Sequence, residues 1–269
     1  MATLPFACTS RPLSTAGFTA ATSSLGVNSA TLWALLSVET PGSGYLVDRR
    51  PQILFERHIF HQLTGGAWDA SNPDISNPSA GGYGPGGTNQ YVRLGAAVAL
   101  NQDAALQSAT WGIGHDMGEH YANLGFASIS DMVMAMAASE DQQLSAVVNF
   151  ITANNLQVAL QNQDWTTYAS RYNGADYAKN KYDTRLASAY SDFSSGARNP
   201  NLTVRTTQTY LTFLKYNPQG IDGLIGSNTL TALHNFQNSA GLSLTSAIDD
   251  NVVAALSDAL PPAVNLLLI

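Results

Sequence analysis

The chain of 269 residues has a single cysteine, few charged side chains and no long apolar run. One cysteine, Cys8, excludes an intramolecular disulfide and fits a protein made in a reducing compartment. No stretch approaches the roughly 20 uncharged apolar residues that a membrane-spanning helix requires. Lys and Arg total 12 against 19 Asp and Glu, and the net charge of -7 argues against charge-driven binding to nucleic acid or to an anionic membrane.

Signals for a metal or a cofactor are also missing. The histidines at positions 58, 61, 115 and 120 form neither an HExxH motif nor a set with paired cysteines. The glycine-rich segment 81–87 lacks the GK[ST] sequence of a phosphate-binding loop, and we interpret it as a flexible loop or flap. The sequence therefore predicts neither a metal site nor a cofactor.

What the chain has is helical periodicity, interrupted by Gly, Pro and Asn. Residues 1–24 are expected to be a loose lead-in, 65–89 a long loop, and 51–63 either helix or strand. A cluster of Gly, Pro and Asn at 194–201 predicts a boundary between two helical domains, 1–195 and 196–269. The fold class is mainly α, with helices expected over 28–39, 90–109, 128–139, 140–155, 165–171, 175–193, 203–215, 226–239 and 249–257.

One carboxylate stands at the end of the first of these helices. Glu39 follows an apolar run and precedes Pro41 and Gly42, which stop the helix. The negative end of the helix dipole and the apolar neighbours both favour the neutral carboxyl and raise its pKa. A general acid for glycoside cleavage must keep its proton in this way. The alternative is a surface Glu that ends an ordinary helix.

Several long segments resemble one family, in one order. They are VETPGSGYLVDRRPQILFERHIF, QYVRLGAAVALNQDAALQSATWGIG, LGFASISDMVMAMAASEDQQLSAVVNFI and WTTYASRYNGADYAKNKYDTRL. Together they resemble the N-acetylmuramidase domain of phage endolysins, within the lysozyme superfamily, over about residues 24–191. The resemblance implies a lysozyme-like helical fold that cuts peptidoglycan between N-acetylmuramic acid and N-acetylglucosamine, with Glu39 as general acid.

The resemblance also points to a tyrosine and an asparagine. Tyr172 and Asn173 match the Tyr-Asn-Gly of lysozyme-like enzymes and transglycosylases, where the Tyr hydroxyl lies near the acid and the Asn shapes the cleft. The alternative is a helix C-cap turn, in which Asn-Gly is common.

A second carboxylate, Glu56, lies in an apolar run. It is a candidate to orient water or to tune the acid. The alternative is a buried structural ion pair with Arg50 or Arg57. The sequence does not decide between these two roles.

The turn at Trp111, Gly112 and Gly114 matches the substrate-binding turn of the family. There, glycines let the backbone approach N-acetyl groups, and the Trp offers a flat face to a pyranose. The alternative is a core Trp beside a tight turn. The family usually places Gln after this turn, whereas this chain has His115 and Asp116. Either His115 makes the contact of that Gln, or the substrate specificity differs.

Residues 221–242 resemble the three-helix peptidoglycan-binding module, in a match that spans about 200–258. The resemblance places a binding groove near Asp222, Gly223, Leu224 and Ile225. Such a module would tether the catalytic domain to its polymeric substrate. The alternative is a helical bundle that only stabilises the first domain.

Together these features predict a peptidoglycan hydrolase that acts as a monomer on the bacterial cell wall. The alternatives are a lytic transglycosylase, which uses the 6-hydroxyl of the sugar itself, and a wall-binding protein without catalysis. Residues 1–24 lack the features of a signal peptide, so we expect synthesis in the bacterial cytoplasm. Holin-type release in phage lysis or a dedicated secretion machine would then deliver the protein. A secreted antibacterial effector would also have an immunity protein as a partner.

Overall fold

The computed structural model describes residues 6–40, 42–172 and 174–262, which belong to two compact units. The first, called here the sheet unit, joins the segment that ends at Arg11 to Gly44–Phe150. The second, the helical unit, joins Pro12–Ser43 to Ile151–Pro262. In these units the C-terminal helices group with the helix that carries Glu39. The boundary between 195 and 196 stays a prediction.

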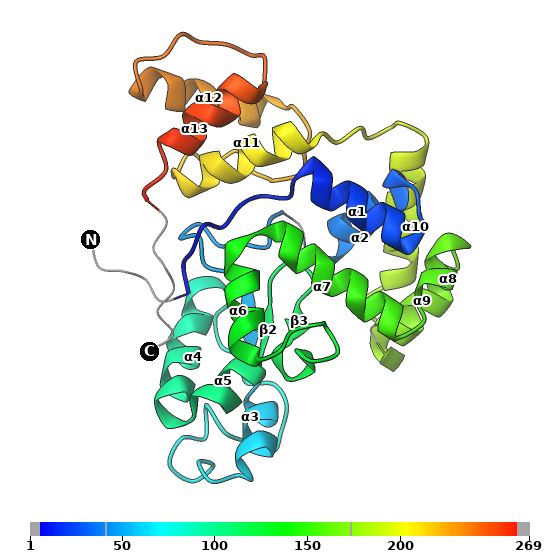
Figure 1. Cartoon of the computed structure of the whole chain (residues 1–269), viewed down its shortest axis with the longest axis vertical. Coiled ribbons are helices and arrows are strands. Elements are labelled where there is room, and N and C mark those ends of the chain that lie inside the picture. The colour runs from blue at the N-terminus through cyan, green and yellow to red at the C-terminus, as the bar shows by residue number, and fades with distance from the viewer. Residues whose placement is uncertain (1–5, 41, 173, 263–269) are drawn as a thin grey trace. The chain divides into compact units, whose positions relative to one another are not determined.

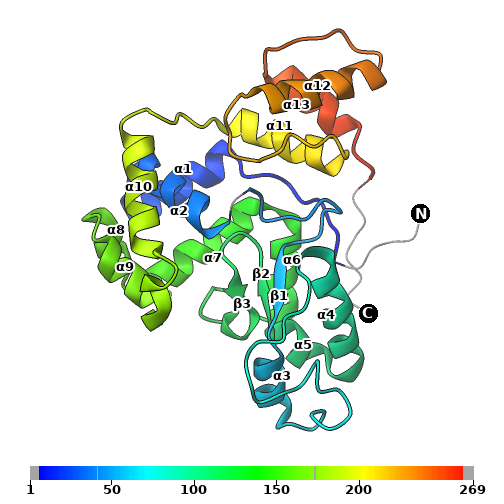
Figure 2. The ribbon, with the colours of Figure 1, turned by 180° about the vertical axis from the view of Figure 1, so that it is seen from behind.

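The sheet unit holds a small antiparallel sheet in the order β1-β2-β3 (Figure 2). Its strands are β1 (Ile53–Phe55), β2 (Ala109–Trp111) and β3 (Asp116–Met117), with Ile53 opposite Trp111. The segment 51–63, expected to be helix or strand, is both: β1 is followed by α3 (Arg57–Thr64).

Helices pack around this sheet in Figure 1. The predicted helix over 90–109 is two helices, α4 (Gln90–Leu100) and α5 (Gln102–Gln107), followed by β2. The chain breaks at Asn101, whose side chain caps α5 by accepting the Ala104 N–H. Then come α6 (Ile129–Ala138), capped by Ser128 as predicted, and α7 (Glu140–Ala153). The core between them contains Phe55, Phe60, Trp111, Leu106 and Met132, all fully buried.

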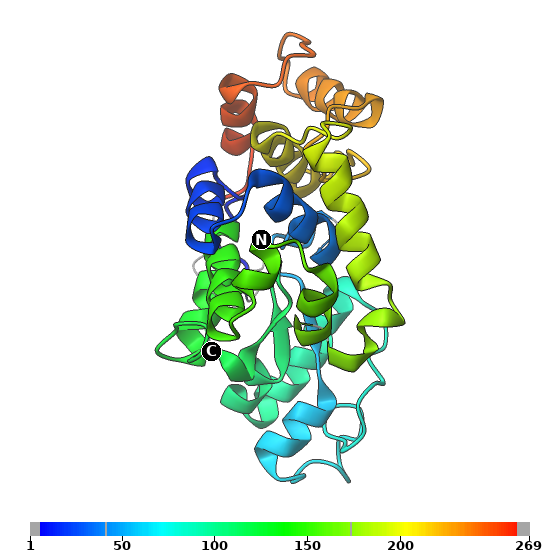
Figure 3. The same ribbon diagram turned by 90° about the vertical axis from the view of Figure 1, so that its right-hand side faces the viewer.

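The helical unit begins with α1 (Thr15–Leu25), where the sequence predicted a loose lead-in. That prediction is wrong for this stretch: the Ser14 side chain caps the helix, and Phe18, Ala21 and Leu25 are buried. The sequence did not predict this helix because short polar residues between the buried positions weaken its apolar periodicity. The unit continues with α2 (Ser29–Glu39), α8 (Gln157–Gln161), α9 (Trp165–Tyr172) and α10 (Tyr182–Ser194). Helix α10 begins later than predicted, because a 3₁₀ turn covers 174–178. Figure 3 shows α2, in blue, beside the yellow-green α10.

Three further helices of this unit, yellow to red in Figure 1, follow the predicted pattern closely. They are α11 (Leu202–Phe213), α12 (Ser227–Ser239) and α13 (Asp250–Asp258). Their core consists of Leu211, Ala232, Leu233, Phe236, Val252 and Leu256. Among the residues that the structure describes, no helix is both long enough and apolar enough to cross a bilayer.

Candidate active site and wall-binding cavity

Glu39 is the last residue of α2, a helix whose sequence leaves it little contact with solvent. Asn28 caps the start of α2 by accepting the Thr31 N–H, and most of the apolar side chains that follow are buried. At the other end, Glu39 is half-buried, and its Oε1 atom is shielded from solvent. The carboxyl group thus stands at the negative end of the macrodipole of a largely buried helix.

Helix α10 packs against this end of α2. Arg185 donates from Nη2 to the carbonyl of Val38 at 3.2 Å, which fixes the backbone immediately before Glu39. Tyr182, one turn earlier on the same face of α10, stacks on Tyr172 with ring centroids 6.2 Å apart and planes 6° from parallel. The half-buried Tyr172 therefore stacks on the same face of α10 from which Arg185 bonds to the end of α2. The predicted partner Asn173 lies outside the described residues.

Trp111, predicted as a flat face for a sugar ring, is a core residue. Its side chain is completely buried, its Nε1–H donates to the carbonyl of Leu106 at 3.0 Å, and its ring contacts that of Phe6. A ring without exposed surface cannot stack on a pyranose, so the core alternative applies here.

The glycines after Trp111 serve close packing on α7. A Cβ atom on Gly112 would lie 2.6 Å from Cδ of Gln143, and one on Gly114 would lie 2.3 Å from Cγ2 of Val147. Gly112 also has a φ of 72°, which favours glycine. At both glycines, side chains of α7 therefore occupy the space in which the sequence analysis expected substrate N-acetyl groups.

Two buried polar side chains on α7, which the sequence analysis missed, hold the backbone of this region. Gln143 accepts from the N–H of Ile113 at 2.9 Å, and Glu140 accepts from the N–H of Gly44 at 2.7 Å. Both are fully buried. Polar residues at inward positions of an otherwise apolar helix were the signal available in the sequence.

His115 and Asp116, the departure from the family pattern, differ in exposure, although desolvation shifts the pKa of both, downward for His115 and upward for Asp116. His115 is exposed, adopts a φ of 49°, and has Nδ1 3.4 Å from Oγ1 of Thr110, so its ring is accessible to a ligand. Asp116 is buried, and burial raises the pKa of its carboxyl from 3.8 to about 7. Its Oδ2 atom has no hydrogen-bond partner in the described part of the chain.

Glu56 lies between β1 and α3, buried, with Oε2 3.1 Å from Nδ1 of His58. Its second contact is Tyr83: burial first, then the charge of Glu56 and its hydrogen bond, raise the pKa of the Tyr83 hydroxyl. The arginines proposed as partners are engaged elsewhere. Arg50 pairs with Asp48 at 2.6 Å, and Arg57 donates to the carbonyl of residue 79.

The segment 81–87, interpreted as a flexible loop or flap, is fastened at two carbonyls. Gln90 donates from Nε2 to the carbonyls of Tyr83 and Pro85 at 2.7 and 2.8 Å, and Arg93 also donates to Tyr83. Gln90 is itself buried and accepts from the N–H of Phe55. Tyr83 connects this segment to Glu56.

Across the described ranges, no group of three or more His, Cys, Asp or Glu side chains is arranged to hold a metal ion. The histidine three residues after His58 instead pairs with a carboxylate: Nδ1 of His61 lies 2.8 Å from Asp69, which also accepts from Ser76.

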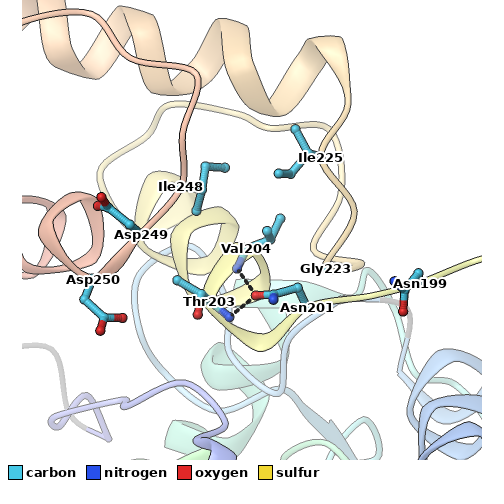
Figure 4. A pocket seen from close by; sticks show the side chains of 9 residues that line it. All are labelled: Asn199, Asn201, Thr203, Val204, Gly223, Ile225, Ile248, Asp249 and Asp250. Carbon is cyan, nitrogen blue, oxygen red and sulfur yellow. Dashed lines mark hydrogen bonds between the residues drawn. The ribbon is translucent and has the colours of Figure 1, made fainter.

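A cavity of about 430 Å³ lies beside the starts of α11 and α13 and the turn that precedes α12 (Figure 4). In the close-up, Ile225 and Ile248 come from two different loops and lie above Val204 of α11. The lining consists of Asn199, Asn201, Thr203, Val204, Gly223, Ile225, Ile248, Asp249 and Asp250.

Of the predicted groove residues, Gly223 and Ile225 line this cavity. Asp222 and Leu224 instead bond to the buried Gln208, whose Nε2 donates to Asp222 Oδ1 and to the Leu224 carbonyl, each at 3.0 Å. The sequence analysis missed the rest of the lining, although Asn201 and Asp249 carry a recognisable signal as helix caps.

Comparison with known proteins connects both parts of the sequence to peptidoglycan. Residues 28–194 match the family model of N-acetylmuramidase, and residues 201–256 match that of a peptidoglycan binding domain. A crystal structure of the endolysin of Burkholderia phage AP3 is 37% identical, with a TM-score of 0.65, over 70% of this chain and 73% of that one. No curated protein matches. The chain belongs to the N-acetylmuramidase family and is a lysozyme-like glycosidase that hydrolyses peptidoglycan.

Proposed function

We propose that Glu39 is the general acid of this enzyme and that the bond it cleaves joins N-acetylmuramic acid to N-acetylglucosamine. The observation that carries the proposal is the position of the carboxyl group, half-buried at the C-terminal end of α2 with Oε1 shielded from solvent. Such a group holds its proton until a glycosidic oxygen is there to accept it.

In this mechanism Glu39 protonates the glycosidic oxygen as the bond to the anomeric carbon breaks. The oxocarbenium-like state is then attacked by water, which leaves a reducing end. Arg185 keeps the backbone before Glu39 in place through the Val38 carbonyl. We assign the Tyr172 hydroxyl to the edge of the reacting site, and we assign His115 a contact of its own with the glycan.

Glu56 is better suited to support than to chemistry. Its carboxylate bonds to Tyr83 of the segment 81–87 and lies 3.1 Å from His58 of α3, although Oε2 makes no hydrogen bond in the described part of the chain. We therefore propose that Glu56 stabilises this part of the sheet unit and that Glu39 is the essential carboxylate.

We assign wall binding to the cavity beside α11 and α13. Its lining is apolar at Val204, Ile225 and Ile248 and carries carboxylate and amide groups at the aspartates and asparagines. A site of this kind buries part of a ligand and orients it through a few polar contacts. Attachment to the polymer would raise the effective concentration of the catalytic site near each glycan strand.

The similarity to a phage endolysin favours lysis of the host wall as the biological setting. Release through a holin-type opening would bring the enzyme to the periplasm. An antibacterial effector, exported by a dedicated machine and neutralised by an immunity protein, is the second setting that the sequence allows. We propose that the protein acts as a monomer in either case.

The products of digestion test the reaction. Purified sacculi are digested to completion, and the fragments are reduced with borohydride and analysed by mass spectrometry. We expect reduced muramic acid at the new ends. Fragments lighter by one water and resistant to reduction would show a transglycosylase, and new ends that carry reduced glucosamine would show cleavage of the other glycosidic bond.

A further inference from the structure

The wall-binding part of the chain reaches the loop that follows the candidate acid. Arg205 belongs to α11, the first helix of the peptidoglycan-binding domain, and is only 3% exposed. Its Nη2 donates to the carbonyl of Gly42 at 2.8 Å, and Gly42 is three residues along the chain from Glu39. A guanidinium group is thus buried against the backbone next to the reacting residue.

A tether to the wall does not require a buried guanidinium group at this position. Burial of a guanidinium group costs several kcal/mol unless hydrogen bonds replace its hydration. The Gly42 carbonyl supplies one of those bonds. A domain that served only to hold the enzyme on the wall would have no need to bury a cation against the catalytic domain.

The loop itself needs support from outside. Gly42 has a φ of 121°, and a Cβ atom placed there would lie 3.9 Å from Cβ of Ile221, in the turn between α11 and α12. The flanking residues Thr40 and Ser43 are buried. Gly42, shortly after the end of α2, is therefore in contact with Arg205 of α11 and close to Ile221.

A second connection holds the same two parts together. The guanidinium group of Arg198 lies 5.0 Å from the centroid of the Phe193 ring, and its Nη2 lies 4.0 Å from Oδ2 of Asp222. The Phe193 ring in turn faces Trp33 of α2 at 6.5 Å. Between the two connections is a cavity of about 330 Å³ lined by residues of both, among them Thr40, Gly42 and Arg205.

We propose that Arg205 is a positioning residue for catalysis, through which the peptidoglycan-binding domain fixes the loop after Glu39. The proposal rests on the role proposed for Glu39. It assigns the C-terminal domain a part in turnover in addition to wall binding. Displacement of a reacting group by about 1 Å is enough to lower a rate by about a hundredfold.

The test uses the full chain with Arg205→Met, Arg205→Lys and, as a control, Lys215→Met. Lys215 is an exposed cation in the same domain, so its loss changes the charge equally without affecting the loop. For each variant, kcat and KM are measured on glycan released from sacculi, and binding is measured by co-sedimentation with intact sacculi. Hydrogen exchange is followed at the amides of Thr40, Gly42 and Ser43.

We expect Arg205→Met to lower kcat about tenfold to a hundredfold, with sacculus binding within about twofold of the parent. The three amides should exchange faster, while α12 and α13 stay protected. Arg205→Lys, which keeps one charged donor, should recover part of kcat, and Lys215→Met should match the parent. Unchanged kcat together with unchanged exchange in Arg205→Met would overturn the proposal, as would a loss confined to sacculus binding.

Two further variants keep the test decisive. If Arg205→Met fails to fold, Ile221→Ala loosens the same loop without removing a charge, and a kcat equal to that of the parent would then reject the proposal. Glu39→Gln separates the two proposals. If it stays active while Arg205→Met still lowers kcat and loosens the loop, the acid assignment fails, and Arg205 retains a role in holding the loop that does not act through Glu39.

Discussion

Gln143 on α7 accepts a hydrogen bond from the backbone N–H of Ile113 at 2.9 Å, and its Nε2 donates to the carbonyl of Met136 at 2.7 Å. One fully buried carboxamide thus joins the turn at 112–115 to two helices. This is possible because Gly112 has no side chain, so the carboxamide approaches its Cα directly. The glycines of this turn are therefore explained by the close packing of α7 against it.

We expect Gly112→Ala to lower the free energy of unfolding by about 2 kcal/mol or more. The new methyl group would lie 2.6 Å from Gln143 Cδ, and alanine disfavours the φ of 72°. Gly95→Ala is the matched control, because Gly95 is exposed in the middle of α4 with no atom near its Cβ position. That change should stabilise the protein by up to about 1 kcal/mol. Urea denaturation measures both, and equal stability of the two variants would refute the packing role of Gly112.

Asp116 should make stability fall as the pH rises. Burial raises the pKa of its carboxyl from 3.8 to about 7, so the folded state favours the neutral form. The contribution of the neutral Asp116 carboxyl to the free energy of unfolding is fully present below pH about 4 and is lost as the pH rises to about 7. The free energy of unfolding should fall by roughly 4 kcal/mol over this range.

The variant Asp116→Asn should therefore be more stable than the parent at pH 8 and should lack this pH dependence. Asp103→Asn, at an exposed position in the first turn of α5, is the control and should leave the dependence intact. Denaturant midpoints between pH 4 and 8 give the comparison. A parent protein whose midpoint stays constant over that range would show that Asp116 is not held neutral.

Two tyrosines of one stack should respond differently to loss of their hydroxyl groups. Tyr172→Phe keeps the ring against Tyr182 but removes the hydroxyl that we assign to the reacting site. We therefore expect kcat to fall at least tenfold. The loss should not exceed the factor of about 10²–10⁴ that a general acid–base group contributes. The Tyr182 hydroxyl is buried with no partner among the described residues, so Tyr182→Phe should leave kcat unchanged and stability equal or higher. Comparable activity of the two variants would remove Tyr172 from the mechanism.

The wall-binding cavity is tested at its apolar lining. Ile225→Ser should weaken co-sedimentation with sacculi about tenfold, since covering an exposed isoleucine with a ligand contributes about 1.5–3 kcal/mol. Leu244→Ser is the control, because Leu244 is equally exposed in the same domain but does not line the cavity. Equal loss in both variants would show a nonspecific apolar effect.

Much of the helical architecture could be predicted because local signals determine it. Asn28 and Ser128 lie at the N-caps of α2 and α6, and the three C-terminal helices follow their apolar periodicity. Helix α1 escaped prediction because polar Ser and Thr residues separate its few buried positions. Asn101 likewise breaks what looked like one helix.

The candidate site was harder to predict, because long-range packing determines it. The sequence indicated Glu39 through its place at the end of an apolar helix. It could not show that Trp111 is buried in the core, that α7 occupies the space beside Gly112, or that Arg205 reaches Gly42 from more than 160 residues away. Each depends on which distant segment packs against the residue.

The central claim is tested most directly by the turbidity of a suspension of purified sacculi. The rate of clearing is compared for Glu39→Gln, the parent protein and Glu119→Gln. Both variants remove one carboxylate, and Glu119 lies in a short 3₁₀ turn of the sheet unit. With binding to sacculi and the unfolding midpoint unchanged in both, we predict that Glu39→Gln leaves the turbidity constant while Glu119→Gln clears the suspension at the rate of the parent. Clearing by Glu39→Gln at a comparable rate would contradict the assignment of Glu39 as the general acid.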